Sequence, residues 1–205
     1  MADGVTKNRR INRTKTAIYQ ALVDLINEKG FNALTVSEIS ERADINRGTF
    51  YKHYRDKFDL LEQIEAEIID DVEGIVLQAQ SLNFTDFNSS DNPLPIVVSI
   101  FEYMKNNSAL INSILGVEGD LAYLNRLGQA VEKNLKLGFL AGLRAKNFLV
   151  PAEYLISYAI FAHFGVIRAW LKNDCRETPR EMAIILSQLS MNGPLRMSGY
   201  QLPPA

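Results

Sequence analysis

The sequence predicts an all-α protein made of a small N-terminal head, a long connecting helix and a helical C-terminal body. Apolar residues recur three and four positions apart along most of the 205 residues, and no stretch alternates apolar and polar residues as a half-buried strand does. Two Thr-x-x-Glu capping boxes, Thr35 with Glu38 and Thr178 with Glu181, mark the starts of helices. Residues 81–95 are rich in Asn, Ser, Asp and Pro, which predicts a loop before the body.

The composition is that of a globular protein with one or two domains. Hydrophobic residues make up 47% of the chain, which is enough for a sizeable core. Cys175 is the only cysteine, so the chain cannot form an internal disulfide and a reducing compartment is expected. No apolar segment follows the initial Met, and the longest uncharged apolar run, residues 154–167, is shorter than the ~18 residues that cross a bilayer. We therefore expect a cytoplasmic protein with no membrane segment.

Charge is distributed unevenly along the chain. The formal net charge is −2, but residues 1–57 hold 11 Lys and Arg against 7 Asp and Glu, a net of +4. Residues 58–205 hold the other 11 against 17, a net of −6. A basic head on an acidic body is expected when only the head meets nucleic-acid phosphates, although an ordinary solvated basic face gives the same count.

Residues 12–29 predict the first helix, the scaffold of the head. Its buried stripe is Ile18, Ala21, Leu22, Leu25 and Ile26. Gly30 is placed to end the helix as a C-cap. Residues 1–11 are polar and are expected to form a disordered arm, which either adds phosphate contacts or is an ordinary frayed terminus.

Residues 35–46 predict a short helix followed by a tight turn. Thr35 is a good cap for this helix, and Ile39 and Ala43, four positions apart, give it one buried side. Residues 44–46 form the turn.

A second short helix is expected from Arg47 to about Tyr54, with Asn46 as its N-cap. Phe50 and Tyr54 are four positions apart and face inward. The other side chains carry hydrogen-bond donors: Arg47, Thr49, Tyr51, Lys52 and His53. Such a helix suits an acceptor-rich partner, and helix-turn-helix units present one to the major groove of DNA.

This stretch resembles the DNA-binding head of the TetR family of transcriptional regulators. The resemblance runs from about residue 12 to about residue 69 and rests on Thr35, Val36, Ser37, Glu38, Ile39, Ala43, Ile45, Asn46, Arg47, Gly48, Thr49, Phe50, Tyr51, His53, Tyr54, Lys57, Leu60 and Leu61. Tyr54 departs from the Phe that is more usual in the family, so its hydroxyl must find a partner or reach water. The resemblance implies a DNA-binding domain over residues 10–70 and a regulatory and dimerisation domain over residues 71–192.

The resemblance also implies which side chains meet DNA. Arg47 is expected to read guanine with its guanidinium fork, with an ordinary surface arginine as the alternative. Thr49 and Tyr51 match family positions that meet phosphates or thymine methyls, unless they are a cap-like threonine and a packed tyrosine. Ser37 is expected to reach the DNA backbone or a base edge. The predicted DNA-binding set is Thr35, Ser37, Asn46, Arg47, Gly48, Thr49, Tyr51, Lys52, His53 and Lys57, of which Lys52, His53 and Lys57 contact phosphate.

Residues 56–79 predict a longer helix, capped by Asp56, that joins the head to the body. A continuous apolar stripe runs along it from Phe58 to Ile75. In the TetR family the corresponding helix transmits the ligand signal by a tilt, and the resemblance implies the same role here.

Three further helices are expected in the body, at residues 95–106, 108–115 and 120–141. Aromatic and Met side chains on the body helices are candidates for an effector pocket, although such residues at helical spacing are more often plain core. The candidate pocket set is Phe101, Tyr103, Met104, Tyr123, Phe139 and Phe164. His163 is expected to be a satisfied or interface histidine.

Residues 151–172 predict the most apolar helix, and both of its sides are apolar. One side fits the core of the body and the other requires a partner. With the last helix, which opens at Thr178 and ends at residues 192–194, it predicts a four-helix dimer interface, as in the TetR family. The candidate interface set is Tyr158, Phe161, Ala162, Gly165, Ala169, Ile185 and Leu189. The C-terminal region is also similar to the subgroup that includes regulators of dihydroxyacetone kinase genes.

Together these features predict a dimeric, sequence-specific regulator of transcription that binds a palindromic operator and needs no cofactor. It is expected to be a repressor released by an effector bound in the body; the alternative is a body that binds a partner protein instead of a small molecule. An enzyme is not expected, because the sequence contains no catalytic set, no metal-ligand spacing and no glycine-rich phosphate loop.

Overall fold

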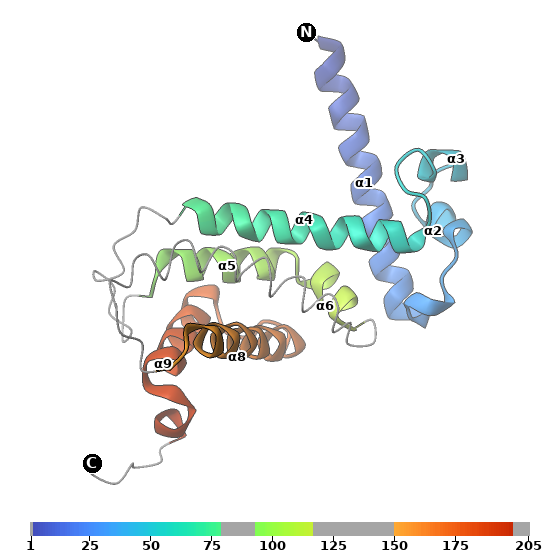
Figure 1. Ribbon diagram of the computed structural model, residues 1–205. Coiled ribbons are helices and arrows are strands. Elements are labelled where there is room, and N and C mark those ends of the chain that lie inside the picture. Colours follow the sequence, from blue (N-terminus) through green and yellow to red (C-terminus); the bar gives the residue numbers. More distant parts are fainter. Residues whose placement is uncertain (1, 79–92, 117–149, 199–205) are drawn as a thin grey trace, which may run out of the picture. The chain divides into compact units, whose positions relative to one another are not determined.

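The computed structural model describes residues 2–78, 93–116 and 150–198, and every regular element within these ranges is helical (Figure 1). The predicted all-α class is therefore confirmed. The chain packs as two compact units: unit 1 is Met1–Glu67 with Ala109–Asp120, and unit 2 is Ile68–Ser108 with Leu121–Ala205. The domain boundary expected between residues 70 and 71 stays a prediction. The helix expected at 120–141 lies outside the described residues.

Unit 1 is built on the apolar stripes that the sequence shows. It contains α1 (Ala2–Lys29), the short 3-10 helix η1 (Phe31–Ala33), α2 (Val36–Arg42), α3 (Arg47–Phe50), the first half of α4 (Lys57–Gln78) and most of α6 (Ser108–Gly116). Its fully buried side chains come from four of these helices and include Ile18, Leu22, Ile39, Phe50, Leu60 and Ile64. This shared core fixes α2 and α3 against α1 and the start of α4.

Polar caps set the helix boundaries in unit 1. Glu38 N donates to Thr35 Oγ1 at 3.3 Å and Thr35 N donates to Glu38 Oε2 at 3.0 Å, so the predicted capping box at the start of α2 is present. The Asp56 carboxylate accepts from the N–H groups of Phe58 and Asp59, both at 2.8 Å, and caps α4. Gly30 ends α1 at a φ of 77°, a conformation that glycine adopts without strain.

Two helix boundaries in unit 1 differ from those expected. The backbone of α1 is helical from Ala2, so the disordered arm predicted for residues 1–11 is wrong: once a helix is nucleated, each residue added to it costs little. The second short helix, α3, ends at Phe50 rather than at about Tyr54. The chain leaves it through a tighter turn, in which His53 N donates to Phe50 O at 2.9 Å.

Unit 2 is held together by packing between α5 (Pro95–Asn106), α8 (Ala152–Lys172) and α9 (Pro179–Met197). The Phe101 ring meets the Trp170 ring edge to face, with ring centroids 5.1 Å apart. Trp170 Nε1 donates to Glu177 O at 3.1 Å, so the buried indole keeps a hydrogen bond. Leu171 of α8 and Ala183 of α9 are also fully buried.

The ends of α9 follow local signals. The second capping box opens the helix, with Thr178 N donating to Glu181 Oε2 at 2.7 Å. At its far end Gly193 interrupts the helical backbone with a φ of 71°, where the sequence predicts the helix to stop. Helical geometry then resumes as far as Met197, beyond the end expected at residues 192–194.

One face of α8 is apolar and exposed. Tyr154, Tyr158 and Phe161 are each more than half exposed. By length and composition alone, the stretch Glu153–Lys172 is apolar enough to cross a membrane, a test that core helices of soluble proteins also pass. Both sides of this helix are therefore apolar, as expected: Leu155, Ala159, Ile160 and Ile167 on one side are half-buried, and the other side is exposed.

Candidate nucleic-acid interface

The buried side of the short helix α3 is anchored by aromatic packing. Phe50 is fully buried, and its ring lies 5.4 Å from the Tyr54 ring and 5.7 Å from the Tyr51 ring, centroid to centroid. At the other end Asn46 caps the helix, and its Oδ1 accepts from Gly48 N at 2.7 Å. A Cβ on residue 48 would lie 3.3 Å from this Oδ1, so any side chain there would press on the cap.

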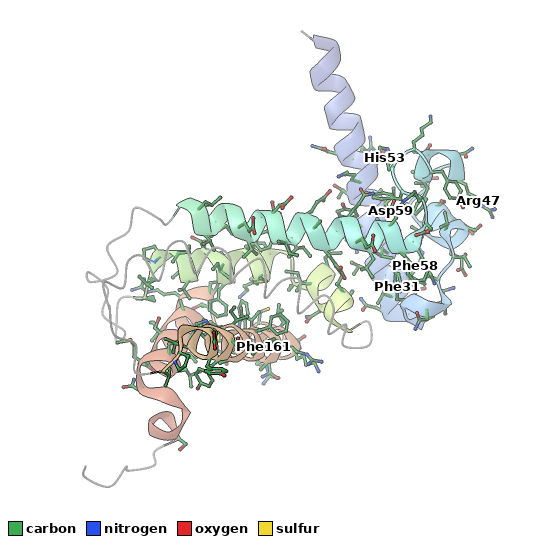
Figure 2. All side chains as sticks on the ribbon, viewed as in Figure 1. Phe31, Arg47, His53, Phe58, Asp59 and Phe161 are labelled. Carbon is green, nitrogen blue, oxygen red and sulfur yellow. The ribbon has the colours of Figure 1, made fainter. Side chains whose placement is uncertain are left out.

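The outward side of α3 and of the turn after it carries donors, as predicted. Arg47, Tyr51 and Lys52 are exposed, while Thr49 and His53 are half-buried. Figure 2 shows Arg47 at the edge of unit 1 and His53 near the end of the turn that follows α3. The structure thus brings the predicted DNA-binding side chains of α3 together on one exposed surface.

Arg47 is oriented by the preceding helix. Its Nη2 donates to the Ser37 hydroxyl oxygen on α2, so two residues of the predicted set are directly bonded to each other. The remaining N–H groups of the guanidinium are enough for a bidentate contact with a base. This pairing could not be read from the sequence, because it depends on how α2 and α3 cross.

The hydroxyl and the backbone N–H of Thr35 both take part in the capping box. Its hydroxyl donates to Glu38 Oε2 at 2.8 Å and accepts from Glu38 N, and the carboxylate of Glu38 also accepts from Lys29. The hydrogen bond from Lys29, followed by those from Thr35, lowers the pKa of Glu38 from 4.5 to about 2. A DNA contact by the Thr35 side chain stays a prediction.

Lys57 occupies a site that the sequence did not suggest. Its Nζ donates to the backbone oxygens of Phe31, Asn32 and Leu34, at 3.1, 2.9 and 2.9 Å. The phosphate contact expected for Lys57 stays a prediction. The three acceptors are backbone carbonyls, which carry no signal in the side-chain pattern.

A partly buried polar cluster joins α1 to α4 in unit 1. Glu67 accepts from the Lys15 ammonium group and, at 2.7 Å, from the Tyr19 hydroxyl. The Tyr54 hydroxyl lies close to this cluster but is only 1% exposed and has no hydrogen-bond partner among the described residues. Burial is the main reason why the pKa of Tyr54 is raised. The neighbouring Tyr19 hydroxyl opposes this rise, so Tyr19 is the polar group that the Tyr54 hydroxyl faces, although no hydrogen bond of regular geometry joins the two.

The predicted effector-pocket residues fall into different environments in unit 2. Phe101 and Met104 are buried in the core, whereas Tyr103 and Phe164 are half-buried. The Tyr103 hydroxyl donates to Asp71 Oδ2 on α4 at 3.0 Å. Tyr123 and Phe139 lie outside the described residues. Among the residues that are described, no three His, Cys, Asp or Glu side chains gather as a metal site.

The predicted interface residues of α8 lie on its exposed side: Tyr158, Phe161, Ala162, Gly165 and Ala169 are all exposed, and Ile185 and Leu189 of α9 are half-buried. Figure 2 labels Phe161 on α8. His163 Nε2 lies 2.9 Å from Ser190 Oγ on α9, and burial lowers the pKa of this histidine. The histidine is therefore satisfied within unit 2, as expected.

Comparison with known proteins matches both parts of the chain. Residues 18–64 match a family model described as bacterial regulatory proteins, tetR family, and residues 91–192 match one described as transcriptional regulator C-terminal region. The chain is 33% identical over 102 residues to the uncharacterized HTH-type transcriptional regulator YxbF of Bacillus subtilis (strain 168). That match covers 47% of this chain but only 26% of YxbF.

Solved structures of regulators share the fold along most of the chain. The dihydroxyacetone kinase operon activator DhaS is 14% identical, with a TM-score of 0.57 over 92% of this chain and 98% of DhaS. The regulator FadR from Bacillus subtilis in complex with stearoyl-CoA is 18% identical, with a TM-score of 0.56 over 87% of this chain and 98% of FadR. At such identities the likeness shows the fold alone.

The family matches cover the helix-turn-helix unit and most of unit 2, and the relatives are regulators of transcription rather than enzymes. The short donor-rich helix on an exposed surface is what a DNA-binding head of this kind requires. The protein is a DNA-binding regulator of transcription, and the chain belongs to the TetR family.

Proposed function

We propose that the protein is a homodimeric repressor that acts in the cytoplasm, binds a palindromic operator and is released by an effector bound in unit 2. The observation that carries this proposal is the exposed donor surface of α3, held rigid by the buried Phe50 and tied to α2 through Arg47 and Ser37. A rigid surface of this kind loses little conformational entropy when it binds.

The proposed contacts divide by role. Arg47 reads a base edge, since it stands at the N-terminus of the recognition helix, where side chains enter the major groove. Tyr51, Lys52 and His53 follow the helix and contact phosphates, which position the head without reading sequence. The backbone around Asn46 and Gly48, with Thr35, Ser37 and Thr49, completes the proposed surface.

The proposed dimer is supported by the open side of α8. Exposed Tyr158 and Phe161 flank smaller residues there, and a Cβ added at Gly165 would meet no atom within 4 Å. A contiguous apolar patch of this kind is costly in water and is covered in the working protein. We propose a second copy as its cover, because a closed two-fold pair also supplies the two heads that a palindrome requires.

The effector is proposed to bind in unit 2. FadR holds stearoyl-CoA, so long-chain acyl-CoA is the first class of effector that we would test here. A partner protein is the second candidate, and it is favoured by the core positions of Phe101 and Met104, which fill part of the proposed pocket with side chains. Calorimetric titration with stearoyl-CoA separates the two candidates, since saturable binding that weakens operator affinity supports the first.

The experiment that tests the proposal is selection of bound fragments from random DNA by the purified full chain, followed by sedimentation of the complex. We expect an inverted repeat occupied by two copies of the chain. Enrichment of a single half-site bound by one copy would contradict the dimer, and absence of any enriched sequence would contradict operator recognition.

A further inference from the structure

The Lys57 ammonium group lies inside a cage of acceptors in unit 1. An ammonium group has three hydrogens and no acceptor, and the three carbonyl oxygens of Phe31, Asn32 and Leu34 take all three of them. The same nitrogen lies 5.0 Å from the centroid of the Phe31 ring and 5.2 Å from that of the Phe58 ring. Such distances are those of cation–π contacts.

The two aromatic rings form a wall of this cage. Phe31 and Phe58 meet edge to face with centroids 5.5 Å apart, so they fix each other as well as the lysine (Figure 2). Phe58 is largely exposed, which is unusual for a phenylalanine next to a polar helix start. Its contact with Phe31 and the Lys57 ammonium gives a reason for this position.

The carbonyls in the cage belong to the connection between α1 and α2. Phe31 O also accepts from Leu34 N at 3.2 Å within the turn, and the Lys57 ammonium group adds a charge-assisted hydrogen bond to each of the three carbonyls. Leu34 directly precedes Thr35, the N-cap of α2. Lys57 is the first residue of α4, so its side chain joins the start of α4 to the start of α2.

We propose that Lys57 is a positioning residue that clamps the start of α2 to α4 and thereby sets the placement of Arg47. The path is short: the clamp holds Leu34, α2 begins one residue later, and Ser37 on α2 accepts the hydrogen bond from Arg47. A phosphate could reach the ammonium group only by replacing one of its carbonyl acceptors. The proposal deepens the proposed DNA-binding function and assigns Lys57 to specificity rather than to general affinity.

The test compares Lys57→Met, which keeps the aliphatic stem, with Lys52→Met, which removes the charge of an exposed lysine in the same head. Thermal unfolding is measured without DNA, and binding is measured to the selected operator and to scrambled DNA, well below both unfolding midpoints. For Lys57→Met we expect a lower unfolding midpoint and a several-fold fall in the ratio of operator affinity to scrambled affinity. For Lys52→Met we expect an unchanged midpoint and an equal loss of affinity for both DNAs.

The ratio of operator affinity to scrambled-DNA affinity distinguishes a positioning role of Lys57 from a purely structural role and from a phosphate contact. Partial unfolding or loss of a phosphate contact lowers binding to both DNAs by the same factor and leaves the ratio unchanged. A Lys57→Met protein with a wild-type midpoint and an equal loss on both DNAs would therefore overturn the clamp and identify a phosphate contact.

A measurement on the unaltered protein covers the case in which Lys57→Met does not fold. In ¹⁵N-lysine-labelled protein, the caged Lys57 ammonium should exchange its hydrogens with water more slowly than that of Lys52. Exchange as fast as that of Lys52 would contradict the clamp. This result and the DNA-free midpoints do not require DNA binding, so failure of the clamp can be told apart from failure of the proposed function.

Discussion

Two apolar surfaces of this chain differ in burial: the underside of α3 is buried, and one side of α8 is exposed. Phe50 under α3 is fully buried by other parts of unit 1, whereas Phe161 on α8 is 53% exposed. Both rings belong to helices with regular apolar spacing, and both were expected to be covered. The support of α3 is thus completed within one chain, whereas the described residues leave this side of α8 exposed, which is why we propose a second copy as its cover.

The largest expected effect comes from removing the support of α3. Phe50→Ala should destabilise unit 1 by about 3–5 kcal/mol, since a fully buried ring is lost, and should abolish DNA binding. Urea unfolding followed by circular dichroism measures the loss, while fluorescence of Trp170, the single tryptophan, reports on unit 2. Tyr51→Ala is the control, because this ring is 57% exposed and its removal should change stability by no more than about 0.5 kcal/mol.

The urea experiment can also contradict the claim that unit 1 is completed independently of unit 2. Equal shifts of the dichroism and fluorescence transitions in Phe50→Ala would mean that the two units unfold as one, and that the head is not completed on its own.

The next effect concerns the open side of α8. Phe161→Asp should weaken dimerisation by at least about 2 kcal/mol, because a central aromatic contact is replaced by a charge. Sedimentation at a series of concentrations measures the dissociation constant. Leu77→Asp on α4 is the matched control, since Leu77 is 51% exposed but lies outside the proposed interface. Equal behaviour of the two variants would remove α8 from the interface, and a wild-type monomer that requires detergent or lipid would point to a membrane surface as the cover.

A smaller effect is expected where α2 meets α3. Ser37→Ala removes the acceptor of the Arg47 hydrogen bond and should cost about 0.5–1.5 kcal/mol of operator affinity. Fluorescence anisotropy with labelled operator measures it. Ser37→Thr keeps the hydroxyl and should retain the affinity; a loss in both variants would mean that side-chain shape, rather than the hydrogen bond, matters at this position.

The smallest effect is a dependence of stability on pH at the start of α2. The folded-state pKa of Glu38 is about 2, below its ordinary 4.5, because Lys29 and Thr35 stabilise its carboxylate. The stabilisation is therefore complete above pH 4.5 and is lost as the pH falls toward 2. Thermal unfolding from pH 5 to pH 2.5 should show a smaller decline in Glu38→Gln than in the wild type, and identical declines would contradict this role.

The parts of the fold that sequence predicted correctly are those that depend on neighbours in the chain. The capping box at Thr35, the cap at Asn46, and the inward positions of Phe50 and Tyr54 follow from residues three or four positions apart. Spacing places an aromatic ring inside a helical body, but it does not say whether a cavity or a neighbouring ring meets it. Phe101 illustrates the limit, since it packs against Trp170.

The parts that sequence could not supply depend on backbone groups or on crossings between helices. The carbonyl cage around Lys57 is invisible in a pattern of side chains, and the Ser37–Arg47 hydrogen bond joins residues on two different helices. The buried Tyr54 hydroxyl shows a further limit: the sequence identifies it as unusual, but the polar cluster of Lys15, Tyr19 and Glu67 beside it appears only in three dimensions.

The most direct test of the central claim is parallel selection of DNA by the wild type and by Arg47→Ala. The wild type should select an inverted repeat. The variant should select the same repeat with relaxed preference at one base pair in each half-site, and should bind the wild-type operator about 1–3 kcal/mol more weakly. If the variant showed unchanged preference at every position, the exposed surface of α3 described here would not be the surface that reads the operator.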